Sequence, residues 1–179
     1  MANYYGKPQS IAAFLSERAQ KAMAEIGAMT KGHLVYSSED YANTLITRYK
    51  VEPLALGQHT PKIPESHPNQ LEVIWPFTGD KQLASLYNNN GQYIQSSKFT
   101  GQYVKEVFTY SSPITASEHN QLQAKNDIEK AATAFREHFS RLNAKIEEFN
   151  QLIAERIPNS VKLKHEALTK IKAAEDFLK

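Results

Sequence analysis

Apolar residues near the start of the chain recur at helical spacing. Intervals of three and four residues separate most members of the set Ile11, Phe14, Leu15, Ala19, Ala22, Ile26 and Met29. Ser10 stands before this set and is a residue type that caps helix N-termini. The pattern predicts a first helix that closes at 31–33, with Gly32 in the left-handed cap position. A short extended run over 33–36 and a second helix over 39–50 are expected to follow.

Prolines and alternating apolar residues replace this pattern in the middle of the chain. Five of the eight prolines lie between Val51 and Phe77. Proline donates no backbone hydrogen bond and restricts the residue before it, which excludes a helix or a central strand over 57–70. Apolar and polar residues alternate at 71–75, as in a half-buried strand, and the segments 51–56, 92–94 and 103–110 are also expected to form strands. This region therefore predicts a small antiparallel sheet.

Neither glycine nor proline occurs from Thr115 to Glu155, and Thr115 with Glu118 fits a capping box. Apolar residues there recur at alternating spacings of four and three, in the order Ile128, Ala132, Phe135, Phe139, Leu142, Ile146, Phe149 and Ile153. Such a heptad pattern predicts a long helix with one apolar side. Pro158 is expected to stop or kink this helix before a shorter helix that runs to the end of the sequence.

These elements predict an α+β fold. A small mixed domain of helices and antiparallel sheet is expected over 1–113, and a long α-helix followed by a shorter helix over 114–179, as a helical hairpin or a kinked rod. The composition changes at the same place, since all nine tyrosines precede residue 111. The second region is expected to act as a coiled-coil-like connector.

The heptad seam, defined as Ile128, Phe135, Phe139, Leu142, Ile146, Phe149 and Ile153, allows three interpretations. It could pack within a hairpin against 161–178, against the mixed domain, or against a second copy in a coiled coil. Its three phenylalanines fit a narrow two-stranded coiled coil poorly, because Leu and Ile fill such seams best. A broader packing surface or a thicker bundle is favoured. The expected partner is a second copy of the chain or another protein domain.

The composition and the absence of known motifs exclude several kinds of catalytic and metal-binding site. The chain has no cysteine, which excludes disulfides, thiolate metal sites and a cysteine nucleophile. Its six histidines form no H-E-x-x-H pair, and no glycine-rich phosphate loop is present. We therefore expect no catalytic residue, no metal site and no cofactor. No apolar stretch approaches the roughly 20 residues that cross a bilayer, so no membrane partner is expected. The N-terminus lacks the features of a secretory signal and the absence of cysteine fits a reducing compartment, so the predicted location is cytoplasmic.

Two polar clusters have a functional and a simpler structural interpretation. Asp80, beside Gly79 and Lys81, could take part in acid–base chemistry, but a turn that starts a helix explains the same residues. The second cluster is a mildly basic stripe near the C-terminus, formed by Lys162, Lys164, Lys170 and Lys172. A nucleic-acid surface usually carries denser positive charge with interleaved aromatics. A turn and a solvated helix face are the favoured interpretations, and nucleic acid is the alternative partner.

The order of short motifs resembles that of a group of bacterial proteins. These motifs are Tyr49-Lys-Val-Glu-Pro53, Pro76-Phe-Thr-Gly-Asp80, a strand that ends near Tyr110, and Phe149-Asn-Gln-Leu152 in a long helix. The order is similar to the N-terminal regions of large uncharacterised bacterial proteins that carry a C-terminal nuclease or TIR-type effector domain, of a kind found in anti-phage defence. The resemblance implies that any catalytic domain would lie beyond this sequence, since no nuclease or TIR motif is present.

The resulting hypothesis is a non-catalytic sensing or assembly module of a larger bacterial protein. Binding of a partner or ligand at the mixed domain would bias the packing of the long helix, and so orient or oligomerise a downstream domain. Nucleic-acid binding through the C-terminal lysines is the alternative.

Overall fold

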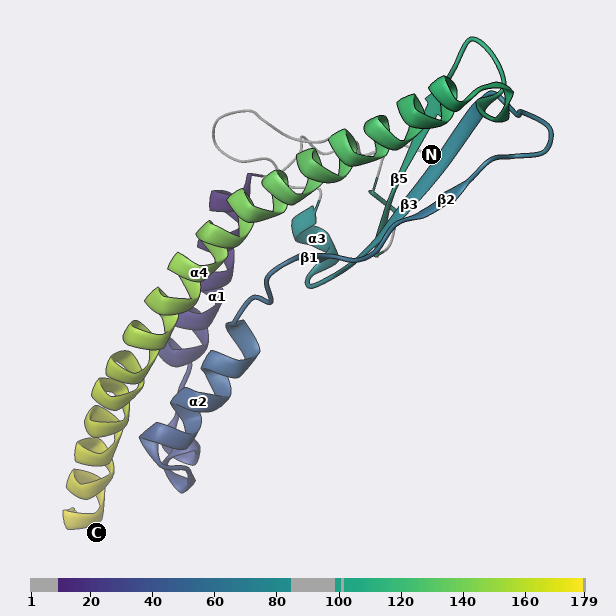
Figure 1. Cartoon of the computed structure of the whole chain (residues 1–179). Helices are drawn as coiled ribbons and strands as arrows, with labels where there is room; N and C mark the ends of the chain where they lie inside the picture. Colours follow the sequence, from purple (N-terminus) through teal and green to yellow (C-terminus); the bar gives the residue numbers. More distant parts are fainter. Residues whose placement is uncertain (1–9, 85–98, 101, 179) are drawn as a thin grey trace. The chain divides into compact units, whose positions relative to one another are not determined.

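The computed structural model describes residues 10–84, 99–100 and 102–178 (Figure 1). It confirms the α+β class, with a small antiparallel sheet, several short helices and one long C-terminal helix. The chain forms two compact units. The first consists of Met1–Ile11 and Glu52–Ala144, and the second of Ala12–Val51 and Lys145–Lys179.

The first unit contains the sheet. Its strands are β1 (Ala55–Leu56), β2 (Thr60–Lys62), β3 (Gln70–Thr78), β4 (Phe99–Thr100) and β5 (Tyr103–Thr109). The order is β1-β3-β5-β4, with β2 also paired to β3, and every pairing is antiparallel. β3 and β5 confirm the strands predicted at 71–75 and 103–110. The strand predicted at 92–94 lies outside the described residues.

The proline-rich segment passes along the edge of β3. β2 contains Pro61 and pairs with residues 72–74, whose other edge is taken by β5. A proline is tolerated there because its missing N–H can face away from the ladder. The exclusion of a central strand from 57–70 therefore holds, although a short edge strand forms. After β3 the chain turns at Gly79, whose φ is 99°, and enters α3 (Lys81–Ala84).

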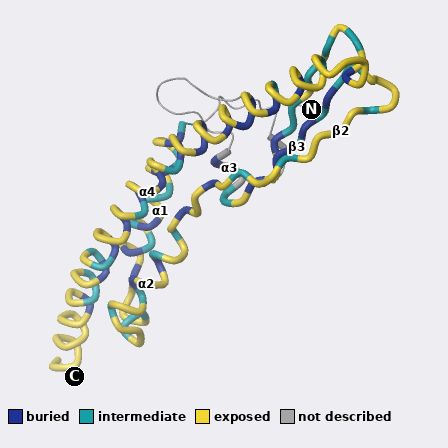
Figure 2. The backbone as a smooth tube through the Cα atoms, in the orientation of Figure 1, coloured by how far each residue is buried: buried dark blue, intermediate teal, exposed yellow. Residues whose placement is uncertain are grey.

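One face of β3 is buried under the long helix α4 (Glu118–Phe177). Trp75 packs edge-to-face on Phe135 of α4 with ring centroids 5.1 Å apart, and Phe77 packs on Phe139 at 5.6 Å. Trp75 is 1% exposed, and its indole N–H meets no acceptor among the described residues. Figure 2 shows the buried positions recurring along α4. The sheet therefore obtains its core from this helix.

The start of α4 differs from the predicted capping box. Residues Ile114–Ala116 form a short 3-10 helix, η3. The hydroxyl of Ser117 accepts a hydrogen bond from the backbone N–H of Asn120 (3.1 Å). Ser117 is thus the N-cap, and Thr115 is not, because the preceding turn places Ser117 directly before the first helical residue.

The separate C-terminal helix and the hairpin are not found, since α4 continues through Pro158. A proline inside a helix costs about 3 kcal/mol, because it leaves the carbonyl four residues earlier without a donor. Ile157 and Val161, on either side of Pro158, are both fully buried. Burial of each such side chain contributes about 1.5–3 kcal/mol, which offsets that cost. The side chain of Asn159 also donates to the carbonyl of Glu155 (3.1 Å) in the same turn.

The second unit packs short helices with the C-terminal part of α4. They are α1 (Ile11–Gly27), the 3-10 helix η1 (Lys31–Val35) and α2 (Ser38–Tyr49), which Ser37 caps by accepting from Asp40 N at 3.0 Å. The extended run predicted at 33–36 is wrong, because backbone bonds three residues apart wind this segment into η1. Gly32 lies within η1 and does not adopt the left-handed conformation.

Polar contacts hold α2 against α1. Arg18 of α1 donates from Nε to the carbonyl of Tyr49 at the end of α2 (2.9 Å). A cation is favourable there because the last carbonyls of a helix carry partial negative charge. Glu25 pairs with Arg48 and accepts from the Tyr49 hydroxyl (2.8 Å), and this hydrogen bond, followed by desolvation, raises the pKa of Tyr49.

The two units do not follow the composition change near Pro113. The predicted division placed all of 1–113 in one domain, whereas the second unit combines Ala12–Val51 with Lys145–Lys179. The physical reason is the length of α4. Its N-terminal part covers the sheet, and its C-terminal part needs other apolar surface, which α1 and α2 supply.

Two asparagines of α4 hold the segment that connects α2 to β1. Asn143 accepts from Leu54 N and donates to Leu54 O, both at 2.8 Å. Asn150 accepts from Val51 N at 3.0 Å and donates to Val51 O at 2.8 Å. Each side-chain amide thus satisfies both backbone groups of one residue. Val51 and Leu54 are themselves buried, so these backbone groups need protein partners.

We expect Asn143→Ala to lower the free energy of unfolding by about 2 kcal/mol, because it leaves two half-buried backbone groups unpaired. Hydrogen exchange at the Leu54 amide should also become faster. Urea unfolding and residue-resolved exchange measure the two effects. Asn126→Ala, at an exposed position of the same helix, corrects for the higher helix propensity of alanine. Equal stability in both variants would contradict the role given to Asn143.

Candidate functional site

A cavity of about 340 Å³ opens between β5 and α4 in the first unit. Its lining comes from two positions of β5 and five of α4, namely Glu106, Phe108, Asp127, Lys130, Ala131, Ala134 and Phe135. The volume lies at the lower end of the range of small-molecule sites, roughly 300–1,000 Å³. The floor is apolar, and three charged side chains stand around it. This β5–α4 pocket is the candidate functional site.

Glu106 occupies a position of β5 that faces the core. It lies opposite Val73 in the sheet register, and Val73 is fully buried. Directly opposite residues of paired strands share one face of a sheet. An apolar residue would satisfy this position at lower cost, because a half-buried carboxylate loses hydration. A charge at a core-facing position is the kind of local departure that often marks a functional site.

Asp127 is fixed at the rim by a tyrosine. The hydroxyl of Tyr110, just after β5, donates to Asp127 Oδ2 at 3.2 Å. Desolvation, the charge of Asp127 and this hydrogen bond together raise the pKa of Tyr110 to about 12. Tyr110 therefore remains a neutral donor at physiological pH and orients the carboxylate. The pocket thus has one carboxylate from the sheet and one from the helix.

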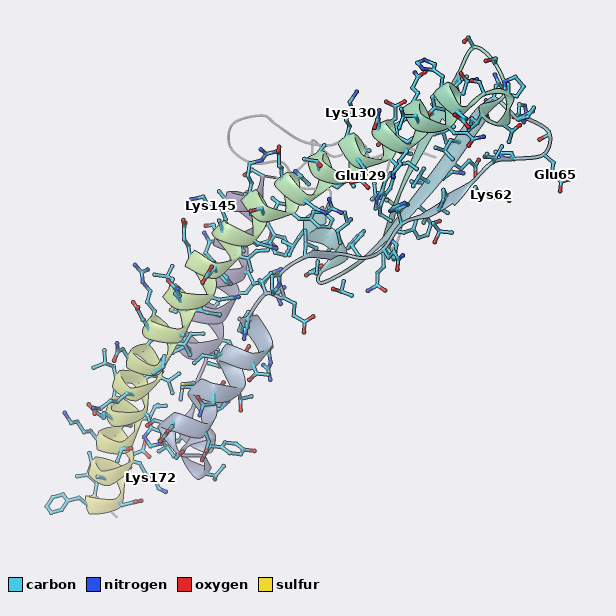
Figure 3. All side chains as sticks on the ribbon, in the orientation of Figure 1. Lys62, Glu65, Glu129, Lys130, Lys145 and Lys172 are labelled. Atoms are coloured by element: carbon cyan, nitrogen blue, oxygen red, sulfur yellow. The ribbon has the colours of Figure 1, made fainter. Side chains whose placement is uncertain are left out.

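The remaining lining explains why the cavity exists. Ala131 and Ala134 lie one turn apart on α4 and are too small to fill the space in front of β5. Phe135 lines the cavity and also packs on Trp75 in the core. Lys130 is exposed, and its side chain extends away from the α4 ribbon (Figure 3). It brings a positive charge to the rim.

The sequence interpretation did not identify these pocket residues. Only Phe135 belongs to a predicted set. A signal was nevertheless present in Glu106, since it interrupts the run of apolar residues at alternate positions formed by Val104, Phe108 and Tyr110. Asp127 and Lys130 carried no comparable signal, because charged residues are common beside an apolar helix face.

All seven residues of the heptad seam are buried inside the chain. Their exposed fractions range from 0% to 9%. Ile128 and Phe135 belong to the core under the sheet, and Phe139 packs on Phe77. The residues from Ile146 onward lie in the second unit. These side chains are therefore buried by contacts within the described chain.

The four C-terminal lysines do not form a stripe. Lys162, Lys170 and Lys172 are exposed and Lys164 is half-buried. At about 100° per residue, Lys162 and Lys164 point roughly 160° apart, as do Lys170 and Lys172. Acidic residues lie among them, and Glu175 forms an ion pair with Lys31 at 2.5 Å. This distribution does not bring the lysines together on one surface.

Asp80 has the structural role favoured from the sequence. Its carboxylate accepts from the backbone N–H of Gln82 (2.9 Å), and its carbonyl accepts from Leu83 N (3.0 Å) at the start of α3. Nowhere in the described ranges do three histidine or carboxylate side chains gather in a way that could hold a metal ion.

The comparisons with known proteins add no relative. No protein-family model matches the chain, and neither the curated proteins nor the solved structures include a significant match. Among the described helices, none is both long and apolar enough to cross a bilayer.

The raised pKa of Tyr110 predicts a pH dependence of stability. The folded state holds the phenol proton up to a pKa of about 12, whereas the ordinary value is 10.0. The contribution of Tyr110 to the free energy of unfolding is thus complete below pH 10 and is lost as pH rises from about 10 to about 12. Urea unfolding across this range should show a smaller decline in Tyr110→Phe. Parallel declines in both proteins would contradict the assignment.

Proposed function

We propose that the chain is a non-catalytic binding module in which occupation of the β5–α4 pocket changes the packing of α4. The single observation that supports this function is the composition of the pocket wall. Five of the lining residues belong to α4, and Phe135 among them also packs on the core residue Trp75. A bound ligand would therefore press directly on the helix that covers the sheet.

The same helix offers a route to the second unit. α4 is continuous from Glu118 to Phe177, and it supplies buried residues such as Phe135 to the first unit and Ile153 to the second. A packed helix transmits a displacement along its axis because its backbone hydrogen bonds keep the spacing of its residues fixed. Binding at the pocket would thus bias the packing of α1 and α2 with the C-terminal part of α4.

The proposed biological setting comes from the resemblance of the short motifs to the N-terminal regions of large bacterial proteins that carry an effector domain. A sensing or assembly role in a larger bacterial protein, of the kind used against phage, would place the responding domain outside this chain. Nucleic-acid binding through Lys162, Lys164, Lys170 and Lys172 is not proposed, since their side chains point in different directions around α4.

Coupling through α4 can be tested without a ligand. Phe135→Leu should weaken the packing of α4 on the sheet by roughly 1 kcal/mol. We expect backbone amides of α4 between Ile153 and Val161 to exchange up to about fivefold faster, because that energy corresponds to about fivefold in an equilibrium constant. Hydrogen exchange measures this effect. Leu122→Ser, at an exposed position of α4 in the first unit, should leave these amides unchanged.

A glycine in α4 where the first unit ends and the second begins tests whether the helix transmits the effect between the units. Ala144→Gly weakens an exposed helical position by about 1 kcal/mol and should reduce the effect of Phe135→Leu on the second unit. Ala173→Gly, at an exposed alanine in the last turns, is the matched control. If Phe135→Leu speeds exchange only in the first unit, α4 does not couple the units and the proposed function is wrong.

A further inference from the structure

Large apolar side chains are exposed along one side of α4 in the second unit. Leu163 is 69% exposed, Ile171 50% and Leu178 82%, and Figure 2 shows the last turns of α4 as exposed. A single exposed leucine is common on protein surfaces, but apolar residues that line up along a helix often mark an interaction surface. This surface belongs to the second unit and is a different site from the β5–α4 pocket of the first.

The three side chains form a continuous stripe together with two alanines. Ala167 and Ala174 stand between the larger residues along the helix and are also exposed. At about 100° per residue, all five positions lie within about 80° of one another around the helix axis. We call this set the C-terminal apolar stripe, and it consists of Leu163, Ala167, Ile171, Ala174 and Leu178. It extends over about four helical turns, or about 22 Å.

Positive charges border the C-terminal apolar stripe. Lys164 lies along one border and Lys170 along the other, about 120° apart around the helix, and Arg156 lies on the same side just before the stripe begins. Among the described residues, no carboxylate forms an ion pair with any of these three cations. Glu175, which also lies at a border, is already paired with Lys31. The stripe therefore has an apolar centre with uncompensated positive charge on both sides.

The alternation of large and small residues makes a second copy of the chain a poor occupant of the stripe. Two helices pack best when the large residues of one lie beside the small residues of the other. Two copies aligned over the full stripe, in either direction, place alanine opposite alanine, and they also bring positive borders together. A different helix can place large apolar residues opposite Ala167 and Ala174, and carboxylates beside the lysines.

We propose that the C-terminal apolar stripe binds an amphipathic helix of a partner protein, with large apolar residues along one side and carboxylates along both borders of that side. The apolar residues pack beside Ala167 and Ala174, as a helix lies on an apolar surface. The carboxylates pair with Lys164 and Lys170. Glu166 points about 100° away from the middle of the stripe and does not face the bound helix. Nucleic acid fits this surface less well, because its phosphate backbone offers negative charge but no apolar face.

Two fluorescent peptides of about 20 residues, enough to cover the stripe, test the proposal on the full chain. Both carry leucines at the a and d positions of a heptad pattern, and the e and g positions are glutamates in the acidic peptide and lysines in the basic one. We expect the acidic peptide to bind saturably, measured by fluorescence anisotropy, and to shift the methyl NMR signals of Leu163 and Ile171. The basic peptide should bind at least about tenfold more weakly, because like charges would face each other. Equal binding of the two peptides, or no binding of the acidic one, would overturn the proposal.

Substitutions locate the binding surface and its charges. Ile171→Ser removes a large side chain from the stripe and should weaken the acidic peptide by about tenfold, whereas Ala173→Ser, at an exposed position outside the stripe, should leave its binding unchanged. Lys170→Gln should weaken the acidic peptide by about threefold, the effect of one exposed ion pair. Lys162→Gln, on the opposite side of α4, is the matched control and should have little effect. Undiminished binding to Ile171→Ser would place the peptide elsewhere and contradict the proposal.

Two other results would assign the stripe to a different occupant. If light scattering shows a dimer of the chain alone that is lost in Ile171→Ser, a second copy covers the stripe and the proposal is wrong. It is equally wrong if a DNA duplex of about 20 base pairs displaces the acidic peptide and its binding depends on Lys170 but not on Ile171. A monomeric chain that binds the acidic peptide and is not displaced by the duplex would support the partner helix.

Discussion

The apolar side of α4 is the constraint on which the rest of the structure depends. The sheet is small and the helices α1 and α2 are short, so neither group can bury its apolar face by itself. Both groups use the same helix, the sheet through contacts such as Trp75 with Phe135, and the short helices through buried positions such as Ile153. This dependence also explains why α4 remains helical at Pro158.

Hydrophobic burial alone would not determine which residues of the connecting segment meet α4, because apolar contacts are not directional. Asn143 and Asn150 provide that direction. They lie seven positions apart, about two helical turns, and therefore on the same side of the helix. Each pairs with both backbone groups of one residue, Leu54 or Val51. The register between the segment and α4 is thus specified by four hydrogen bonds.

The β5–α4 pocket interrupts this otherwise apolar packing. Glu106 and two alanines of α4 occupy places where larger apolar side chains would bury more surface. Less apolar surface is therefore buried between β5 and α4 at the pocket. Other contacts hold these two elements: β5 pairs with β3, and Phe135 of α4 packs on Trp75 in the core. The same Phe135 side chain also lines this cavity.

Local patterns in the sequence determined the elements with short-range causes. Helical spacing identified α1 and α4, strand patterns identified β3 and β5, and the Gly79–Asp80 turn followed from residue type. The heptad seam was also evident as an apolar helix side. These features depend on residues a few positions apart, so that a single stretch of sequence is sufficient to predict them.

The tertiary structure alone decided how those elements combine. It determined that Phe135 is buried in the first unit and Ile153 in the second. It also determined that α4 continues through Pro158 and that the side chain of Asn143 binds the backbone of Leu54. It also placed Glu106 of β5 and Asp127 of α4 in the lining of one cavity. Many of these contacts join residues far apart along the chain, where helical or strand periodicity carries no information. Their energy arises only when separate elements pack, which is why the pocket could not be predicted from the sequence pattern.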